Sequence, residues 1–261
     1  MRGARNRRSA IDGVIHPTAV IESQVEIGPN TEIGPFCRFE GRVRVGSGNR
    51  FVTGVAVGGA PMDRRYSGEP TGVIIGDSNV FYEYATIHRS TGVGTLTRVG
   101  DENCIMAYVH IAHNCRVGSR CTLANGVQLA GHVEVHDGAT IGGLTGVHQF
   151  CRIGELAMVG ACSYVNKDIP PFMLAAGNPC RVVGLNTVGL RRAGVTAEAV
   201  AGLKLASRLL YRSGLNLVQA LGRIEQESLV EVAEVARLVD FCRETGRGVE
   251  LRCEAAECGV E

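Results

Sequence analysis

The sequence predicts a parallel β-helix followed by a small α-helical C-terminal domain. Three observations lead to this fold class. Apolar residues recur at every sixth position from residue 15 to residue 165, glycine often follows the apolar residue, and a helical period replaces the repeat after residue 186. A fixed short period of this kind is the sequence signature of a repeat architecture.

The six-residue repeat is the strongest signal in the chain. Of its 26 positions 24 are apolar, whereas a composition of 45% apolar residues would give roughly 12 by chance. Because glycine tolerates the positive φ of a tight turn, we interpret each hexapeptide as a short strand plus a turn. Three hexapeptides then form one triangular coil of 18 residues, and about eight coils stack roughly 4.8 Å apart into a prism near 40 Å tall.

The repeat also sets the predicted domain boundaries. Residues 1–12 are interpreted as a flexible basic tail, since MRGARNRRSA lacks the apolar segment of a signal peptide. The β-helix is expected to span residues 13–186. A helical C-terminal domain is expected at 187–261.

Two interruptions are expected within the β-helix. Asp63 and Glu69 break the apolar series and mark an excursion at 58–72, which is rich in polar residues and turn formers. Loops of this length on a regular scaffold are often functional. The segment Ser90–Thr97 predicts a second interruption, although Val93 keeps the phase. Two consecutive prolines at 170 and 171 are expected to end the β-helix, because proline cannot donate to a ladder.

The C-terminal domain is expected to contain three helices. The first begins with Thr196 as its N-cap and ends near Gly214. The last begins with a capping box formed by Ser228 and Glu231, and it ends at Gly246. A shorter helix lies between them.

Charge and cysteine usage limit the function classes. The net charge of +1 favours neither nucleic acid nor a membrane surface as a partner. No run of apolar residues is long enough to span a membrane, so no stable membrane insertion is expected. The ten cysteines show no CxxC pair and no regular disulfide spacing, which predicts a cytoplasmic protein with reduced thiols. Four of them are expected inside the prism: Cys37, Cys115, Cys121 and Cys151.

Five of the seven histidines lie within 39 residues of one another, and stacking brings several of them together. Because residue n lies beside residue n+18, His113 is expected next to Gly131, and Gln128 over His110. A glycine leaves its backbone N–H accessible, so His113 and Gly131 would form a base beside an oxyanion donor. Four histidines are expected to share one edge: His110, His113, His132 and His148.

Three interpretations of this cluster remain open from the residues alone. The histidines could be polar corner residues that face water. His110, His113 and His132, or one histidine from a neighbouring subunit, could bind zinc, as in the hexapeptide proteins of the gamma carbonic anhydrase class. The cluster could instead catalyse acyl transfer, which needs a base, an oxyanion donor and a groove.

Short motifs along nearly the whole chain match one family. They are IHPTAVI at 15–21, RYSGEPT at 65–71, TIHR at 86–89, HIAHNC at 110–115, LAGHV at 129–133, GVHQFCRIG at 146–154, MVGACS at 158–163, GLN at 184–186 and GLRRAG at 189–194. In these motifs the chain resembles the UDP-N-acetylglucosamine O-acyltransferases, the first enzymes of lipid A synthesis. The repeat begins at residue 15 and leaves no room for the uridine-binding domain of the related N-acyltransferases. Families with this repeat wind left-handed, so the resemblance implies a left-handed β-helix.

The resemblance implies a reaction and roles for residues. The substrates would be UDP-N-acetylglucosamine and an R-3-hydroxyacyl chain on acyl carrier protein, with no cofactor besides the carrier's phosphopantetheine and no metal. His113 would be the general base and Gly131 N–H the oxyanion donor. The family forms homotrimers with active sites between subunits. Residues that would bind the nucleotide sugar or the carrier's arm are Asp63, Arg65, His110, His132, His148, Gln149, Asn186 and Arg192.

The chain departs from the family pattern at several positions. Asn114 stands where many members have Asp, so His113 is expected to be a weaker base, although Asn can still accept the ring N–H and fix its tautomer. Ala161 replaces a Gly that bounds the acyl groove, which Met158 also lines, and is expected to shorten the favoured chain. Three further departures leave a 3-amino sugar open as the acceptor: Pro179, Val188 and Ala193.

The early helical domain is basic, which suits docking of an acidic acyl carrier protein. The cationic residues are Arg191, Arg192, Lys204, Arg208 and Arg212. A non-catalytic hexapeptide scaffold and a zinc protein remain the alternatives from other classes.

Overall fold

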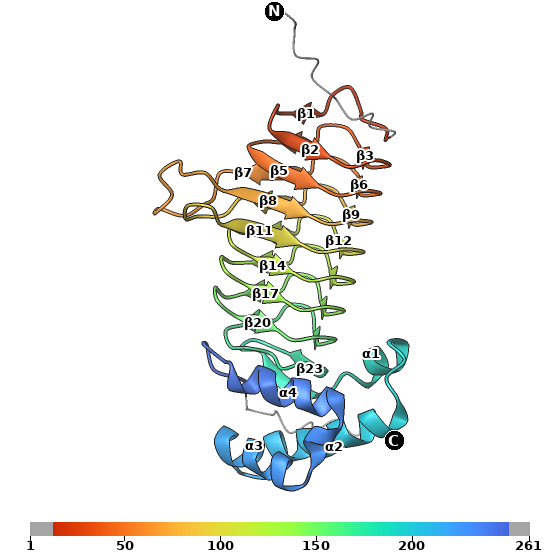
Figure 1. Cartoon of the computed structure of the whole chain (residues 1–261), viewed down its shortest axis with the longest axis vertical. Coiled ribbons are helices and arrows are strands. Elements are labelled where there is room, and N and C mark those ends of the chain that lie inside the picture. Colours follow the sequence, from red (N-terminus) through yellow and green to blue (C-terminus); the bar gives the residue numbers. More distant parts are fainter. Residues whose placement is uncertain (1–12, 251–261) are drawn as a thin grey trace, which may run out of the picture.

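The computed structural model describes residues 13–250. The predicted basic tail at 1–12 and residues 251–261 of the predicted helical domain lie outside this range. Most of the described chain forms a left-handed parallel β-helix, and a small group of helices follows at one end of the prism (Figure 1). The predicted fold class is confirmed.

Three sheets form the faces of the prism, and each coil contributes one strand to each of them. Sheet I contains β1 (Val20–Ile21), β4 (Arg38–Phe39), β7 (Ala56–Gly59), β10 (Thr86–His88), β13 (His110–Ile111), β16 (Gln128–Leu129), β19 (Gly146–Val147) and β22 (Tyr164–Val165). Sheet II contains β2 (Val25–Ile27), β5 (Arg42–Val45), β8 (Gly72–Ile75), β11 (Leu96–Val99), β14 (Arg116–Val117), β17 (Glu134–Val135) and β20 (Arg152–Ile153).

Sheet III completes the triangle and carries two extra strands at its C-terminal end. It contains β3 (Glu32–Ile33), β6 (Arg50–Phe51), β9 (Val80–Phe81), β12 (Cys104–Ile105), β15 (Thr122–Leu123), β18 (Thr140–Ile141), β21 (Met158–Val159), β23 (Met173–Ala176) and β24 (Arg181–Leu185). The chain runs from sheet I to sheet II to sheet III in each coil. The edges at which it passes from one sheet to the next are named the I–II, II–III and III–I edges.

The apolar residues of the repeat fill the interior of the prism. The largest fully buried side chains are mostly members of the six-residue series, among them Phe39, Phe51, Phe81, Ile87, Ile105, Ile111, Leu123, Leu129 and Ile141. Burying each such side chain contributes about 1.5–3 kcal/mol. The four cysteines expected inside are at most 1% exposed, which confirms their structural position.

The glycines that follow the repeat residue serve a different purpose from the one predicted. The positive φ of each turn falls two residues later, for example at Asn114 (φ 60°) and His132 (φ 61°). Glycine is needed after the repeat residue because the coils stack closely there. A Cβ on Gly100 would lie 2.7 Å from the carbonyl oxygen of Gly118 in the next coil.

Both interruptions occur, with corrected bounds. The excursion comprises residues 60–71, because Gly58, Gly59 and Gly72 belong to β7 and β8. In the second insertion Val93 is 76% exposed and is not a core residue, although it keeps the phase. The insertions preserve the phase because Ala56 pairs with Thr86, and Thr86 with His110, at separations that remain multiples of six.

The β-helix continues past the two prolines, contrary to the prediction. Met158 and Val159 of β21 pair in parallel with Leu174 and Ala175 of β23, and β24 then adds an antiparallel strand. The prolines occupy the connection before β23 and therefore leave no gap in a ladder.

The helices are α1 (Thr187–Arg192), α2 (Ala197–Arg212), α3 (Leu217–Gln226), a 3-10 turn η1 (Leu229–Glu231) and α4 (Ala233–Arg243). Thr196 caps α2 as predicted, and Gly214 follows that helix with a positive φ. The capping box predicted at Ser228 is wrong, since Ser228 is left-handed and makes no side-chain cap. The capping box belongs instead to α3, where the amides and side chains of Asn216 and Gln219 pair reciprocally.

Candidate active site

His113 lies in the turn after β13, on the I–II edge, and its side chain is 13% exposed. Its Nδ1 lies 2.9 Å from Asn114 Oδ1. That oxygen also accepts the Thr91 amide at 2.9 Å, while Asn114 Nδ2 donates to Thr91 O at 3.0 Å. Because these two bonds fix which amide atom is the oxygen, Nδ1 of His113 must carry the proton. Its Nε2 therefore presents a lone pair, as a general base requires.

Gly131 lies directly against the His113 ring. A Cβ on Gly131 would be 2.6 Å from Nε2 of His113, so no other residue fits there without moving the ring. The next residue holds the two turns together, because His132 N donates to His113 O at 3.0 Å. Among the described residues no acceptor is bonded to the Gly131 amide. The stacking predicted between His113 and Gly131 is present.

Asp63 reaches the base from the excursion of the same chain. Its Oδ2 lies 3.9 Å from Nε2 of His113, and its side chain is 9% exposed. Arg65 holds this carboxylate through Nη2 at 3.0 Å, Nε at 3.2 Å and its backbone amide at 3.0 Å. These bonds keep the pKa of Asp63 well below its usual range, so Asp63 is ionised. A negative charge thus lies on the Nε2 side of the ring.

The four histidines expected on one edge are divided between an edge and a face. His132 lies on the I–II edge, with its ring 5.3 Å from that of His113 and stacked 4.7 Å from Phe150. His110 and His148 instead lie on the outer face of sheet I. They line a hollow of about 430 Å³ whose walls also include Gln128, Ala130, Gly146, Gln149 and Tyr164.

The environment of His110 keeps it neutral at physiological pH. Burial, followed by the neighbouring His88 and His113, lowers the pKa of His110 to about 4. Its Nδ1 lies 2.8 Å from the hydroxyl of Thr86. Burial also lowers the pKa of His132. Both rings are therefore suited to hydrogen bonding rather than to ion pairing with a substrate.

His88 also belongs to this group, although it is not among the predicted site residues. Its ring lies 5.1 Å from that of His110, and its Nδ1 donates to Ala60 O in the excursion at 2.7 Å. The TIHR motif contains His88. Stacking each residue n beside residue n+18, however, does not place His88 next to any of the clustered histidines. The second insertion changes the offset, so that Thr86 pairs with His110.

Asn186 and Arg192 are not brought to His113 within one chain. Asn186 caps α1, accepting the Gly189 amide at 3.0 Å, and its Nδ2 donates to Leu156 O at 2.9 Å. Leu156 lies between β20 and β21, on the II–III edge. Arg192 is exposed in the last turn of the same helix. Figure 1 shows α1 on the opposite side of the prism from the excursion.

Ala161 lies on the third edge. It lines a mostly apolar hollow of about 530 Å³ on the III–I edge together with Tyr108, Leu144 and Cys162. Met158 is half-buried on the outer face of β21, because its neighbour Val159 points into the core. Residues Gly126 and Gly143 leave this hollow unobstructed.

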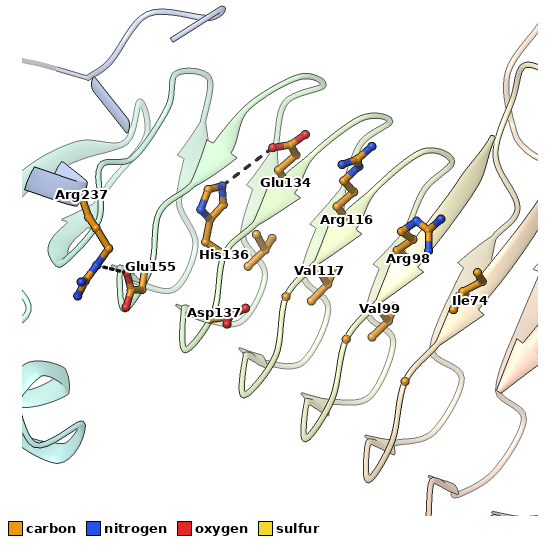
Figure 2. Close-up of a pocket in the computed structure, with 14 residues that line it drawn as sticks. Ile74, Arg98, Val99, Arg116, Val117, Glu134, His136, Asp137, Glu155 and Arg237 are labelled. Carbon is orange, nitrogen blue, oxygen red and sulfur yellow. Dashed lines mark hydrogen bonds and ion pairs between the residues drawn. The ribbon is translucent and has the colours of Figure 1, made fainter. Parts of the chain in front are cut away.

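A hollow of about 940 Å³ lies on sheet II (Figure 2), and His113 is not among the residues that line it. Charged side chains from successive strands cover it. Figure 2 shows the pairs Glu134–His136 and Glu155–Arg237, which approach to 4.0 Å and 2.9 Å. A base with an oxyanion donor occurs on the I–II edge instead, which is the candidate active site.

Within residues 13–250, no three His, Cys, Asp or Glu side chains converge in a way that could hold a metal ion. His110 contacts His88, whereas His113 contacts His132, so the three rings considered as zinc ligands do not meet. No helix in the same range is long and apolar enough to cross a membrane.

Comparisons with known proteins agree along the chain. A family model described as "Udp N-acetylglucosamine O-acyltransferase; Domain 2" matches residues 168–250, and one described as "Bacterial transferase hexapeptide (six repeats)" matches residues 96–131. The acyl-[acyl-carrier-protein]–UDP-N-acetylglucosamine O-acyltransferase of Verminephrobacter eiseniae is 47% identical over 257 residues, which cover 90% of this chain and 98% of the relative. The protein of the same name from Thiobacillus denitrificans is 45% identical over 258 residues, with the same coverage.

Solved structures give the same result. The UDP-N-acetylglucosamine acyltransferase of Francisella novicida superposes with a TM-score of 0.83 at 35% identity, covering 95% of this chain and 99% of that one. The enzyme from Campylobacter jejuni gives a TM-score of 0.84 at 37% identity, covering 92% and 93%. The chain belongs to the UDP-N-acetylglucosamine O-acyltransferase family.

Proposed function

We propose that this protein transfers an R-3-hydroxyacyl chain from acyl carrier protein to the 3-hydroxyl of UDP-N-acetylglucosamine, the first step of lipid A synthesis. The observation that carries the proposal is the contact of His113 with Gly131 beside an ionised Asp63. Two relatives are named acyl-[acyl-carrier-protein]–UDP-N-acetylglucosamine O-acyltransferases, which agrees with the proposed donor and acceptor. We place the reaction in the cytoplasm, where the free cysteines of the described chain stay reduced.

The geometry suits general-base acyl transfer. Nε2 of His113 takes the proton of the sugar hydroxyl while that oxygen attacks the thioester carbon. The Gly131 N–H stabilises the oxyanion of the tetrahedral intermediate. When the intermediate collapses, the C–S bond breaks, and the imidazolium returns the proton to the departing phosphopantetheine sulfur. An ester and a free thiol result, so the reaction needs no cofactor besides the carrier's phosphopantetheine.

Asp63 supplies a charge that Asn114 lacks. Asn114 fixes the Nδ1–H tautomer but cannot stabilise the imidazolium by charge. The Asp63 carboxylate, 3.9 Å from Nε2, lies beside the ring on which positive charge develops during the reaction, and it stabilises that charge in the transition state. A sugar hydroxyl placed beside both groups would be oriented by Asp63 and deprotonated by His113.

The acyl chain is proposed to run across sheet I. The hollow that contains Ala130 and Gly146 lies on this face, and the hollow at Ala161 begins at adjoining residues on the III–I edge. The chain would therefore start at the thioester carbon near His113 and end at Ala161. The mostly apolar walls of the hollow at Ala161 suit the end of a hydrocarbon chain.

The site is proposed to form between subunits of a homotrimer. His113 lies on the I–II edge and Arg192 beside the II–III edge, so one chain does not present both to a single nucleotide sugar. Co-expressed subunits carrying His113→Ala and Arg192→Ala test this arrangement. If sites form between subunits, some interfaces of a mixed trimer combine an intact His113 with an intact Arg192, and activity is restored. If each site lies within one subunit, every mixed trimer is as inactive as its parents.

The carrier is proposed to dock on α2. Lys204, Arg208 and Arg212 lie one turn apart and line a hollow of about 610 Å³ against β24. Acyl carrier protein is acidic, so this cationic row provides charge complementarity. Arg208→Glu should raise the KM for the acylated carrier and reduce its salt dependence, while Arg223→Glu on α3 serves as the control. Equal KM values for both variants would reject this docking surface.

The reaction is tested by incubating the protein with UDP-N-acetylglucosamine and 3-hydroxyacyl carrier proteins of several chain lengths. An alkali-labile ester product supports the proposal. Transfer only to the 3-amino analogue, giving a stable amide, would identify a related nucleotide sugar as the acceptor. No transfer to either acceptor at any chain length would reject the proposed function.

A further inference from the structure

Three consecutive coils place their I–II connections one above another. The excursion at 60–71 joins β7 to β8, residues 89–95 join β10 to β11, and the turn that contains His113 joins β13 to β14. Figure 1 shows both insertions projecting from the same side of the prism, near β8 and β11. The excursion must therefore pass the second insertion to reach the base.

Glu69 joins the excursion to the second insertion. Its Oε1 accepts the Gly92 amide at 2.8 Å, and its Oε2 accepts the Ser67 amide at 2.8 Å and hydroxyl at 3.1 Å. The Gly92 amide, followed by that of Ser67, lowers the pKa of Glu69 to about 2. A backbone bond from Gly94 N to Pro70 O, 3.0 Å long, reinforces the same contact.

The second insertion in turn holds Asn114. Thr91 precedes Gly92, and both backbone groups of Thr91 bond the Asn114 side chain. The backbone amide of Asn114 donates at 2.9 Å to the hydroxyl of Thr97, which lies in β11 just after the insertion. Any displacement of residues 91–92 is therefore transmitted to the atom that fixes the His113 tautomer.

We propose that Glu69 is a positioning residue of the active site, acting through Gly92, Thr91 and Asn114 on His113. The inference rests on the proposed function. The excursion that carries Glu69 also carries Asp63, whose carboxylate lies next to Nε2 of His113. The excursion therefore acts on Nε2 directly through Asp63, and on Nδ1 indirectly through Glu69 and the second insertion.

The contacts favour positioning over substrate binding. Both carboxylate oxygens of Glu69 accept hydrogen bonds from backbone amides of this chain. The beginning of the excursion is held separately, since Arg89 donates to Gly58 O at 2.6 Å and to the Tyr66 hydroxyl at 3.1 Å. Loss of Glu69 should therefore release residues 90–95 without unfolding the excursion.

Glu69→Gln tests the proposal, because an amide NH₂ would face one of the two N–H donors and break that bond. We expect kcat to fall about tenfold, as small displacements of catalytic groups cost this much or more. Glu32→Gln is the control, since Glu32 pairs only with Arg50 on the exposed face of sheet III. It should leave kcat unchanged.

A double-mutant cycle with Asn114→Ala separates positioning from a general loss of stability. If Glu69 acts through Asn114, adding Glu69→Gln to Asn114→Ala should cost less than twofold further. A tenfold cost in both backgrounds would overturn the proposed route. If the wild-type protein transfers no acyl chain at all, the proposed function fails, and the route is then judged on structure alone.

Hydrogen–deuterium exchange supplies that structural readout. Glu69→Gln should speed exchange of the Thr91, Gly92 and Gly94 amides at least tenfold, while exchange in sheets II and III stays at the wild-type rate. Thr91 is decisive, since its amide bonds Asn114 and not Glu69. Unchanged exchange of the Thr91 amide would overturn the proposal, whatever the activity.

Discussion

The His113 ring lies against the α-carbon of Gly131, where a Cβ would be 2.6 Å from Nε2. Gly131→Ala should therefore displace the base from the oxyanion donor. We expect kcat to fall about 10²-fold, the scale of a misplacement near 1 Å. Gly222→Ala is the control, since a Cβ on this α3 glycine meets no atom within 4 Å. A Gly131→Ala enzyme with wild-type kcat would show that the close contact has no catalytic role.

Asn114→Asp is expected to have two opposing effects. A carboxylate beside Nδ1 favours the protonated ring, so the acidic limb of the pH–rate profile should move to higher pH. The second carboxylate oxygen, however, would face Thr91 O, to which Asn114 Nδ2 now donates at 3.0 Å. Losing that bond should lower the free energy of unfolding by about 1–2 kcal/mol. An unchanged acidic limb would refute the expected influence of residue 114 on the base.

The prism could be predicted because its six-residue repeat is visible directly in the sequence. Each sixth residue must be apolar to fill the interior, so the series that includes Ile111, Leu129 and Val147 fixes the phase and the stacking of the edges. The contact of His113 with Gly131 followed directly. The capping box at Ser228 was predicted wrongly because Ser228 adopts a left-handed conformation before a 3-10 turn, and its side chain caps no helix.

Relationships that cross an insertion could not be predicted. The excursion has no repeat, so only the family resemblance, and not the stacking of the coils, put Asp63 in the candidate site. Neither of them predicted the contact of Glu69 with Gly92. His88 was missed for the same reason, as the second insertion shifts its stacking partner. The roles proposed for Asn186 and Arg192 depend on the proposed homotrimer, and one chain's sequence does not specify how subunits would meet.

His110 should make the protein less stable at mildly acidic pH. Its pKa is about 4 in the folded protein, below the value of about 6.5 expected in the unfolded chain. Between these values the unfolded chain binds more protons, so the free energy of unfolding falls as the pH decreases. From pH 7 to pH 5 the contribution is at most about 2 kcal/mol.

Denaturant unfolding of wild type and His110→Asn at these two pH values measures the effect, at one fixed protomer concentration. The variant should lose less stability than wild type between pH 7 and pH 5, because Asn cannot be protonated. Equal losses would mean that another group causes the acid sensitivity.

Ala161→Gly should lengthen the preferred acyl chain. Ala161 lines the apolar hollow on the III–I edge, and removing its methyl extends that hollow. One methylene of substrate is worth about 1–3 kcal/mol of discrimination, so kcat/KM for the next longer chain should rise roughly tenfold relative to the wild-type optimum. Gly222→Ala again serves as a remote control. An unchanged chain preference would reject Ala161 as the determinant of length.

The role of His113 is tested most directly by measuring acyl transfer to UDP-N-acetylglucosamine by wild type and His113→Ala under identical conditions. We expect transfer by wild type and a loss of about 10³-fold in kcat for the variant, with UDP-N-acetylglucosamine still bound, since a general base supplies about 10²–10⁴-fold. A variant that retains kcat within tenfold of wild type would contradict the assignment of His113 as the base.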